Sequence, residues 1–320
     1  MKASINTKYG PPEVVKIMEV DKPIPKDNEA LIKVHATTVN RTDCGFRSAE
    51  YFISRFYSGL FKPRNKILGN EFAGEIEAIG KEVTLFKTGN KVFGYNDTRF
   101  GAHAEYMIMA EDQPIATMPG NLTYEEAAPI TEGAHYALCD IRAAKVKSGQ
   151  KVLINGASGG IGSAAVQLLK YFGTEVTAIC GTKNVELIKS LGADVVIDYT
   201  KQDFTKLNQT FDFIFDSVGK SSFGQCKPLL NKNGIYISTE LGKYSENIFL
   251  ALVTPVLGGK KVLFPVPTIS KEDVLFLKEL VETGKYKPVI DRKYKFDQIA
   301  EAYRFVETGQ KTGNVVITMT

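Results

Sequence analysis

The sequence predicts an α/β protein that combines a doubly wound parallel sheet with a second, β-rich domain. A chain of 320 residues is long for one hydrophobic core, so we expect two domains. From about Leu122 onward, short buried strands alternate with amphipathic helices, which is the order that a parallel sheet with crossover helices requires. Before Leu122, short strands are separated by turns rich in proline and glycine, as in an antiparallel sheet.

The first third of the chain contains three stretches typical of strands. We predict them at Ala30–Val39, Glu71–Ile79 and Lys91–Tyr95, the last directly after the turn signal Gly89-Asn90. Together they indicate an antiparallel β domain.

The middle of the chain has the spacing of a doubly wound sheet, with five strands expected in about 90 residues. The predicted strands are Lys151–Asn155, Glu175–Cys180, Val195–Asp198, Phe211–Asp216 and Gly234–Ser238. Helices are predicted at Gly160–Phe172 and Asn184–Leu191, and the first of them places its apolar residues on one face.

Toward the C-terminus, we predict two helices, Lys271–Glu282 and Gln298–Thr308, and a last strand, Val315–Met319. This strand has no partner in the alternation, so we expect it to return to the β domain. The most apolar segment, Ile248–Leu257, contains Pro255 and is too short to span a bilayer. We predict a loop or an interface segment there.

Composition and charge argue against several classes of protein. The formal net charge is +4 and no long run of Lys or Arg occurs, so we expect no nucleic-acid partner. The four cysteines lie far apart without a CxxC pair, which predicts reduced thiols rather than disulfides or a zinc ribbon. Residues Met1–Gly10 lack the apolar stretch of a signal peptide. We therefore expect a cytoplasmic protein without a membrane segment.

The clearest local motif is a glycine cluster between the strand Lys151–Asn155 and the helix that follows it. Gly156, Gly159 and Gly162 recur at every third position, which is a variant of the GxGxxG fingerprint. Such glycines permit a tight turn, close approach of the backbone to a pyrophosphate, and close packing of helix on strand. The N-terminus of the helix presents free N–H groups to phosphates. Because the cluster lies inside a βαβ unit, we interpret it as a dinucleotide site rather than a structural turn.

The residues after the second strand of this unit bear on which dinucleotide binds. An NAD site has an acidic residue about 20 residues beyond the loop, where it bonds the ribose 2′-hydroxyl. Here Cys180 is followed by Gly-Thr-Lys-Asn, with no Asp or Glu before Glu186. Lys183 offers a cation for a 2′-phosphate instead, so we predict NADPH. The alternative for Lys183 is a solvated lysine at the start of a helix.

The chain resembles the zinc-free quinone oxidoreductase (zeta-crystallin-like) branch of the medium-chain dehydrogenase/reductase superfamily. The runs that carry the resemblance are NGASGGIGSAAVQLLKYFGTEVTAICGTKNVELIKSLGADVVIDYT, NEFAGEIEAIG before it and GNVVIT at the end. The resemblance covers essentially the whole chain. It implies a GroES-like β domain at 1–122, completed by 265–320, a Rossmann domain at 123–264, and an active site in the cleft. It also implies a homodimer formed through the strand Lys260–Val266.

Zinc alcohol dehydrogenases of this superfamily hold catalytic zinc with a Cys, a His in a Gly-His-Glu motif, and a further Cys or Asp. In the matching stretches of this chain, Asn40 replaces the first Cys, Asn70 replaces the His, and Pro129–Ala134 contains no Cys. Neutral amide oxygens do not substitute for thiolate and imidazole around Zn²⁺. We therefore expect an enzyme without zinc.

The resemblance implies two catalytic residues. Asn40 would lie beside the nicotinamide, and Tyr51 matches a tyrosine of the substrate pocket. A second pocket tyrosine of the family is replaced by Gly45. The proton donor therefore stays open between solvent and a tyrosine.

The resemblance also implies cofactor contacts. They are Ser158, Gly159, Gly160 and Ile161 at the pyrophosphate, Thr182 and Lys183 at the 2′-phosphate, Tyr199 at the adenosine phosphate, Ser217, Val218 and Gly219 at the ribose and nicotinamide, Phe264 and Val266 at the carboxamide, and Asn314 at the mouth of the cleft. The structural alternatives are turn residues at Ser217, Gly219 and Asn314 and a core aromatic at Phe264.

The chemistry that remains without a metal is hydride transfer from NADPH to an already electrophilic acceptor. We expect reduction of a quinone or an α,β-unsaturated carbonyl, with hydrogen bonds to the developing oxyanion. One alternative is a non-catalytic NADPH-binding sensor or partner protein on the same fold. The other is a zinc alcohol dehydrogenase, against which the missing ligands argue.

The Lys183→Glu variant tests the cofactor prediction. A carboxylate at this position repels a 2′-phosphate, so we expect NADPH affinity to fall at least about tenfold. NADH affinity should change little, because NADH lacks that phosphate. Titration of both cofactors measures the two effects, and equal binding of NADH and NADPH by the unaltered protein would contradict the prediction.

Overall fold

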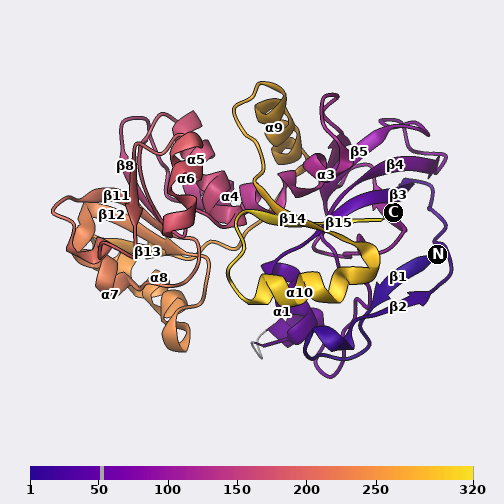
Figure 1. Ribbon diagram of the computed structural model, residues 1–320, viewed down its shortest axis with the longest axis horizontal. Helices are drawn as coiled ribbons and strands as arrows, with labels where there is room; N and C mark the ends of the chain where they lie inside the picture. The colour runs from indigo at the N-terminus through magenta and orange to yellow at the C-terminus, as the bar shows by residue number, and fades with distance from the viewer. Residues whose placement is uncertain (51–53, 320) are drawn as a thin grey trace. The chain divides into compact units, whose positions relative to one another are not determined.

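The computed structural model describes residues 1–50 and 54–319 of the chain. The described chain forms two compact units, each assembled from segments that are distant in sequence (Figure 1). Unit 1 comprises Met1–Glu132, Ile269–Thr283 and Ile290–Thr320, and unit 2 comprises Gly133–Thr268 and Gly284–Val289. Residues 123–132, which the sequence assigns to the Rossmann domain, thus group with unit 1.

Unit 2 is built on a six-stranded sheet in the order β10-β9-β8-β11-β12-β13, with all neighbours parallel. Its strands are β8 (Lys151–Asn155), β9 (Glu175–Cys180), β10 (Val195–Asp198), β11 (Phe211–Asp216), β12 (Leu230–Ser238) and β13 (Lys261–Leu263). All five strands predicted for this region are present, and β12 begins earlier than predicted. From β8 the chain moves outward to β9 and β10 and then returns to β11 on the other side of β8. This reversal confirms the doubly wound topology.

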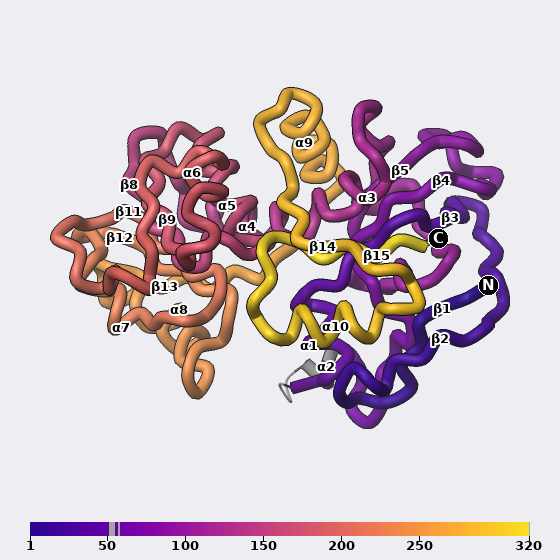
Figure 2. Tube along the Cα trace, viewed as in Figure 1, coloured from indigo at the N-terminus to yellow at the C-terminus, as the bar shows by residue number. Residues whose placement is uncertain are grey.

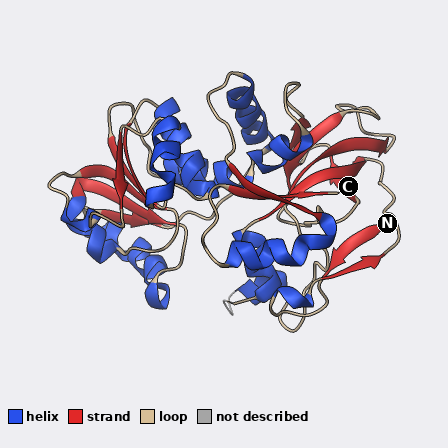
Figure 3. Cartoon of the chain, in the orientation of Figure 1, coloured by secondary structure: helices blue, strands red, loops and turns tan. Residues whose placement is uncertain are grey.

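Helices connect these parallel strands and lie on both sides of the sheet (Figure 3). They are α5 (Gly160–Tyr171), α6 (Val185–Ser190), α7 (Phe223–Cys226) and α8 (Glu246–Leu257), preceded in the chain by α4 (Glu132–Ala143). Side chains such as Leu153, Ile179 and Ile214 are fully buried in one apolar cluster of this unit. Strands buried on both faces account for the nearly continuous apolar runs in the sequence.

The segment Ile248–Leu257 is helical, and the prediction of a loop was wrong. It forms most of α8, whose residues Leu250 and Ala251 pack on the core of unit 2. Pro255 lies near the C-terminal end of the helix, so the missing N–H and the ring disturb only its last turn. In that turn Thr254 Oγ1 donates to the Leu250 carbonyl at 2.7 Å and accepts from the Val262 amide at 2.8 Å.

Unit 1 contains a seven-stranded sheet in the order β14-β15-β3-β4-β5-β7, with β6 paired to β3. Its strands are β3 (Glu29–Val39), β4 (Glu71–Ile79), β5 (Lys91–Tyr95), β6 (Tyr106–Ala110), β7 (Ile115–Thr117), β14 (Ile290–Lys295) and β15 (Asn314–Thr318). Neighbours are antiparallel except β14 and β15, which are parallel. The predicted antiparallel β domain is thus present, with one parallel pair at its edge.

The last strand returns to the β domain as predicted. β15 pairs antiparallel with β3, so that Ile317 lies opposite Thr37, and the yellow end of the chain lies beside indigo β3 in Figure 2. Val315 and Ile317 are fully buried with Val39 and Tyr303 in one apolar cluster. Burial of this strand explains why the C-terminal residues belong to unit 1.

Shorter elements complete unit 1. They are β1 (Lys2–Ile5) and β2 (Lys16–Glu19), which form a separate antiparallel pair, and the helices α1 (Arg41–Ser48), α2 (Ser54–Ser58), α3 (Tyr124–Ala127), α9 (Lys271–Glu282) and α10 (Ile299–Glu307). α9 matches its predicted bounds, and α10 matches within one residue at each end. No helix in the described part of the chain is both long and apolar enough to cross a membrane.

The Ile317→Ala variant tests the contribution of β15. Removing a fully buried Ile side chain should lower the free energy of unfolding by about 2–5 kcal/mol, because it leaves a cavity between the sheet and α10. Val195→Ala serves as a control, since Val195 is 49% exposed. Urea unfolding of both variants measures the difference, and similar losses in the two would show that β15 contributes little.

Candidate functional site

The parallel sheet of unit 2 brings together the loops that follow its strands. The carboxyl ends of parallel strands face one edge, and register pairs Asp216 with Asn155 and Asp198 with Cys180 at that edge. The sequence-predicted residues that follow these strand ends are Ser158, Gly159, Gly160, Ile161, Thr182, Lys183, Tyr199, Ser217, Val218, Gly219, Phe264 and Val266. The edge includes the point between β8 and β11 where the strand order reverses, which is where open α/β sheets bind ligands.

The glycine loop has the backbone geometry of a phosphate cradle. Gly156 has a φ of +84°, and a Cβ there would lie 2.4 Å from the Val218 side chain. A Cβ at Gly162 would lie 2.2 Å from the Gly156 carbonyl oxygen, so α5 approaches the turn too closely for any side chain. Gly159 precedes α5 as its N-cap without a side-chain cap. The N-terminus of α5 therefore has the shape and the N–H groups that a pyrophosphate requires.

Thr182 and Asp198 form the polar end of this edge, after β9 and β10. The Thr182 hydroxyl donates to Asp198 Oδ2 at 2.7 Å and is 2.9 Å from the Thr200 hydroxyl. Thr200 adds its hydroxyl and its amide to Asp198 Oδ1, at 2.7 and 3.0 Å. The Thr182 hydrogen bond, aided by Thr200, lowers the pKa of Asp198 to about 2. A carboxylate therefore does stand beside Thr182, and sequence reasoning missed it because it lies on the next strand.

The two other predicted residues of this end are exposed. Lys183 lies in the turn Thr182–Asn184 that precedes α6, and Tyr199 is 62% exposed. The Tyr199 hydroxyl lies so near Gly181 that a Cβ at that glycine would be 3.2 Å from it. Exposed cationic and phenolic groups here are accessible to a ligand.

Asp216 shapes the turn that contains Ser217, Val218 and Gly219. Its buried carboxylate accepts from Asn155 Nδ2 at 3.1 Å and from the Ser221 amide at 3.0 Å, and burial raises its pKa. Ser217 Oγ donates to the Asn155 carbonyl at 2.9 Å. The turn is thereby fixed against the end of β8.

After β13, the predicted contacts Phe264 and Val266 differ in exposure. Phe264 is half-buried, whereas Val266 is 78% exposed. The Val266 carbonyl accepts a weak hydrogen bond from Cys139 Sγ at 3.8 Å.

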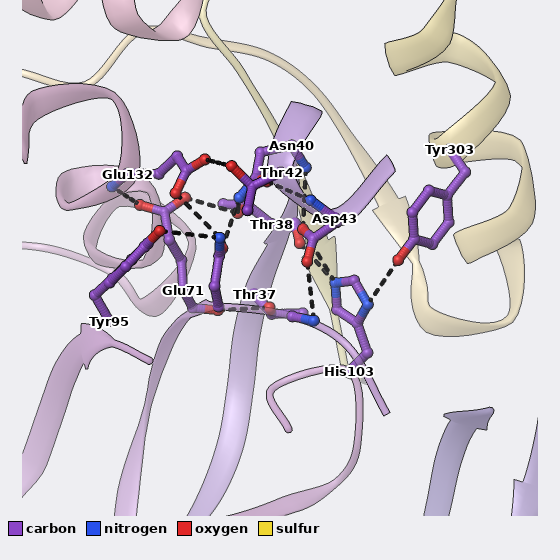
Figure 4. Close-up of polar contacts among 12 residues, drawn as sticks. Thr37, Thr38, Asn40, Thr42, Asp43, Glu71, Tyr95, His103, Glu132 and Tyr303 are labelled. Atoms are coloured by element: carbon purple, nitrogen blue, oxygen red, sulfur yellow. Dashed lines mark hydrogen bonds and ion pairs between the residues drawn. The ribbon is translucent and has the colours of Figure 1, made fainter. Parts of the chain in front are cut away.

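Unit 1 contains a buried polar network around Asn40 (Figure 4). Asn40 is the N-cap of α1, and its Oδ1 accepts from the Asp43 amide at 3.0 Å. Asn40 Nδ2 therefore points the other way and donates to Asn70 Oδ1 at 2.6 Å. Asn70 Nδ2 in turn donates to Glu132 Oε2 at 3.1 Å and lies 3.4 Å from the Tyr95 hydroxyl. The helix cap thus sets the direction of the whole chain of hydrogen bonds.

Two buried carboxyl groups, Glu71 and Glu132, lie beside these amides. Glu71 accepts from Thr38 Oγ1 at 2.7 Å, from the Thr131 amide and hydroxyl at 3.0 Å each, and from the Glu132 amide at 2.5 Å. Glu132 Oε1 accepts from Thr42 Oγ1 at 2.7 Å. Burial, followed for Glu132 by the charge of Glu71, raises the pKa of both groups. Sequence reasoning did not single out either residue.

Asp43 and His103 form the far side of the network. Asp43 is fully buried, and burial raises its pKa to about 7 although the amides of Asn40 and Gly69 bond to it. His103 Nε2 lies 2.7 Å from the Thr38 carbonyl, which only accepts, so this nitrogen carries the hydrogen. Burial lowers the pKa of His103 to about 4, so the ring is neutral and Nδ1 accepts from Tyr303.

The donor set at the positions of the zinc ligands does not fit zinc. The Asn40 and Asn70 amides bond directly to each other, and neither offers a thiolate or an imidazole. Burial raises the pKa of nearby Cys44 to about 12, so its sulfur stays protonated. Among residues 1–50 and 54–319, no group of three or more His, Cys, Asp or Glu side chains could hold a metal ion.

Of the three remaining predicted site residues, two belong to unit 1 and one is not described. Asn40 is 6% exposed, and Asn314 is the first residue of β15 and 5% exposed. Tyr51 lies outside the described residues.

The fold and the glycine loop define a protein of the dinucleotide-binding oxidoreductase class. Residues 26–120 match the family model of the alcohol dehydrogenase GroES-like domain, and residues 191–317 match that of the zinc-binding dehydrogenase. The 2-methylene-furan-3-one reductase of Solanum lycopersicum is 34% identical over 329 residues, covering 99% of this chain and 79% of that protein.

A second related sequence and a solved structure are also similar to this chain over nearly its whole length. The NADPH-dependent alkenal/one oxidoreductase of Arabidopsis thaliana is 29% identical over 99% of this chain and 79% of its own length. The solved quinone oxidoreductase of Coxiella burnetii superposes with a TM-score of 0.89 at 27% identity, covering 100% of this chain and 99% of that one. This chain belongs to the medium-chain dehydrogenase/reductase superfamily, in its quinone oxidoreductase branch.

The Gly162→Ala variant tests the phosphate cradle. Its Cβ would meet backbone atoms of Gly156 and Ala157 at 2.2 and 2.8 Å, so the loop must move, and affinity for NADPH or NADH should fall at least about tenfold. Gly159→Ala is the matched control, because a Cβ there meets only the Gly156 oxygen at 3.7 Å. Fluorescence titration measures both affinities. Equal effects of the two substitutions would argue against the cradle.

Proposed function

We propose that this protein is an NADPH-dependent oxidoreductase that reduces quinones or α,β-unsaturated carbonyl compounds without zinc. The observation that carries the proposal is the glycine cradle at the point of strand reversal in a chain of this family. The names of the relatives support the choice of acceptor, since they include an alkenal/one oxidoreductase, a furanone reductase and a quinone oxidoreductase.

The cradle fits a dinucleotide, and particular residues would hold it. The N–H groups at the start of α5 would bind the pyrophosphate. Thr182, Lys183 and Tyr199 would face the adenosine end, where Lys183 supplies positive charge for a 2′-phosphate. The Asp198 carboxylate accepts hydrogen bonds from the Thr182 and Thr200 hydroxyls and thereby orients both side chains. When bound, the cofactor supplies a hydride from its nicotinamide ring.

The polar network of unit 1 bears on the class of acceptor that the enzyme can reduce. Its amide pair, Asn40 and Asn70, carries no charge and provides no Lewis acid, so the acceptor itself must be electrophilic. Quinones and enones meet this requirement, whereas oxidation of an alcohol needs help in losing its proton. The donor set thus supports an acceptor class that needs no metal.

We also infer that the protein forms a homodimer through the edge of unit 2. β13 is the last strand of the parallel sheet, so one side of it lacks a partner strand within the described sheet. The neighbouring helix α8 exposes Phe249, Leu252 and Val256 at 65%, 71% and 86%. An apolar helix face beside an open strand edge favours pairing with a second copy.

The thiol groups favour a reducing compartment, and we propose the cytoplasm. The four cysteines are thiols rather than disulfides, and Cys44, Cys180 and Cys226 are buried.

The decisive experiment is consumption of NADPH with a panel of quinones, enals, enones and primary alcohols. We expect turnover of quinones or enones with NADPH, no oxidation of alcohols, and no loss of activity after dialysis against a chelator, because Asn40 and Asn70 are not zinc ligands. Elemental analysis of the purified protein checks the metal content. Stoichiometric zinc would contradict the proposal, and cofactor binding without turnover of any acceptor would favour the non-catalytic alternative.

A further inference from the structure

Glu132 occupies an unusual position for a carboxyl group. It is the last residue of the first of the three segments that form unit 1, and it is 5% exposed. Its backbone amide is held by Glu71 Oε1, and its side chain lies between Thr42 and Asn70, at 2.7 and 3.1 Å (Figure 4). Burying a carboxyl group costs free energy, and buried ionisable groups with shifted pKa values are frequent at functional sites, so Glu132 is a candidate functional residue.

The directions of the hydrogen bonds decide where a proton on Glu132 can go. Because Asn40 caps α1 with its oxygen, Asn70 must present its NH₂ group to Glu132 Oε2. The Tyr95 hydroxyl accepts a hydrogen bond from the Asn70 NH₂ group. It also bonds to Glu132, and there it donates its hydrogen to the carboxyl group. Only the hydrogen bond between Thr42 and Glu132 can reverse its direction in this set, since the Thr42 hydroxyl can both donate and accept. A proton on Oε1 therefore points to Thr42.

The surrounding charges favour a proton on Glu132 rather than on Glu71. Glu71 accepts four hydrogen bonds, two of them from the backbone amides of Thr131 and Glu132, which can only donate, so its negative charge is better supported than that of Glu132. Glu132 faces that charge, and Asp43 adds a weaker one from α1. The positive charge of Lys311, which is half-buried before β15, interacts favourably with negative charge on Glu132 and Glu71. Burial, however, lowers the pKa of Lys311 itself. Burial and Glu71 together raise the pKa of Glu132.

We propose that Glu132 stores the proton that enone reduction consumes and delivers it through the Thr42 hydroxyl. Thr42 is half-buried, so it is the more exposed end of this pair. Hydride addition to the β-carbon leaves an enolate, whose α-carbon takes the hydroxyl proton of Thr42. The Glu132 proton replaces it, and the resulting carboxylate is reprotonated by water. The proposal rests on the proposed function, and it assigns Glu132 a role through Thr42 rather than a contact with substrate.

The Glu132→Gln variant tests this role, because glutamine keeps the shape and the acceptor oxygen but has no acidic proton. Methyl vinyl ketone requires protonation at carbon, whereas the oxygens of reduced menadione take protons readily from water. We expect turnover of methyl vinyl ketone to fall about 10²-fold, and its ratio to menadione turnover to fall at least about tenfold. In the unaltered protein, methyl vinyl ketone turnover should decline as the pH rises through the raised pKa of Glu132, and this decline should vanish in the variant.

Three further variants control the test. Thr42→Val should reproduce the change in substrate ratio, and Thr42→Ser should restore it, because serine keeps the hydroxyl. Glu29→Gln alters another buried glutamate of unit 1, paired with Arg99, and should leave the ratio unchanged. Thermal melts identify any variant that does not fold. If Glu132→Gln does not fold, comparison of Thr42→Val with Thr42→Ser tests the relay instead.

The outcomes separate this proposal from the proposed function. If the unaltered protein reduces neither compound, the proposed function fails. If it reduces both and Glu132→Gln lowers the two rates equally, or neither, Glu132 is a structural residue and the proton relay is wrong.

Discussion

The parallel alignment of six strands is the constraint on which unit 2 depends. It directs every strand-end loop to one edge, and it forces the first crossover helix, α5, against the turn after β8. The close contact between Gly162 and the Gly156 carbonyl follows from that crossover. Because this contact excludes side chains, backbone N–H groups define the loop surface, which is the kind of surface that suits a phosphate. Asp216 then secures the neighbouring turn by accepting hydrogen bonds from Asn155 and Ser221.

In unit 1 the buried carboxyl group of Glu71 has the corresponding role. It joins β3, β4 and the segment before α4 through four hydrogen bonds, and it holds Glu132 against the amide pair. Burying a carboxylate in this way is unfavourable unless every acceptor site is used, which explains the density of donors around it. At the positions of the zinc ligands of zinc alcohol dehydrogenases, this chain has the amides of Asn40 and Asn70, with the carboxyl groups of Glu71 and Glu132 beside them. Such an arrangement suits proton transfer, which is the role that we propose for Glu132.

Most of the fold could be predicted from local pattern. The five central strands, the helix after the glycine loop and the return of the last strand all have strong periodicity or an unpaired position in the alternation. The failure at Ile248–Leu257 has a clear cause, since Pro255 stands one turn from the helix end and packing on the core outweighs it. The elements α1, α4, β1 and β2 were not predicted. An N-terminal cap defines α1, and pairing between distant segments defines β1 and β2.

The sequence alone determined the nucleotide loop and the loss of zinc ligands, because both depend on residue types within short stretches. Asn40 and Asn70 exclude thiolate and imidazole whatever their surroundings. Only the tertiary structure decided which other side chains surround the two sites. Asp198 meets Thr182 because β9 and β10 are in register, and Glu132 meets Thr42 because Glu71 draws distant segments together. Such contacts join residues far apart in the chain, and no local pattern records them.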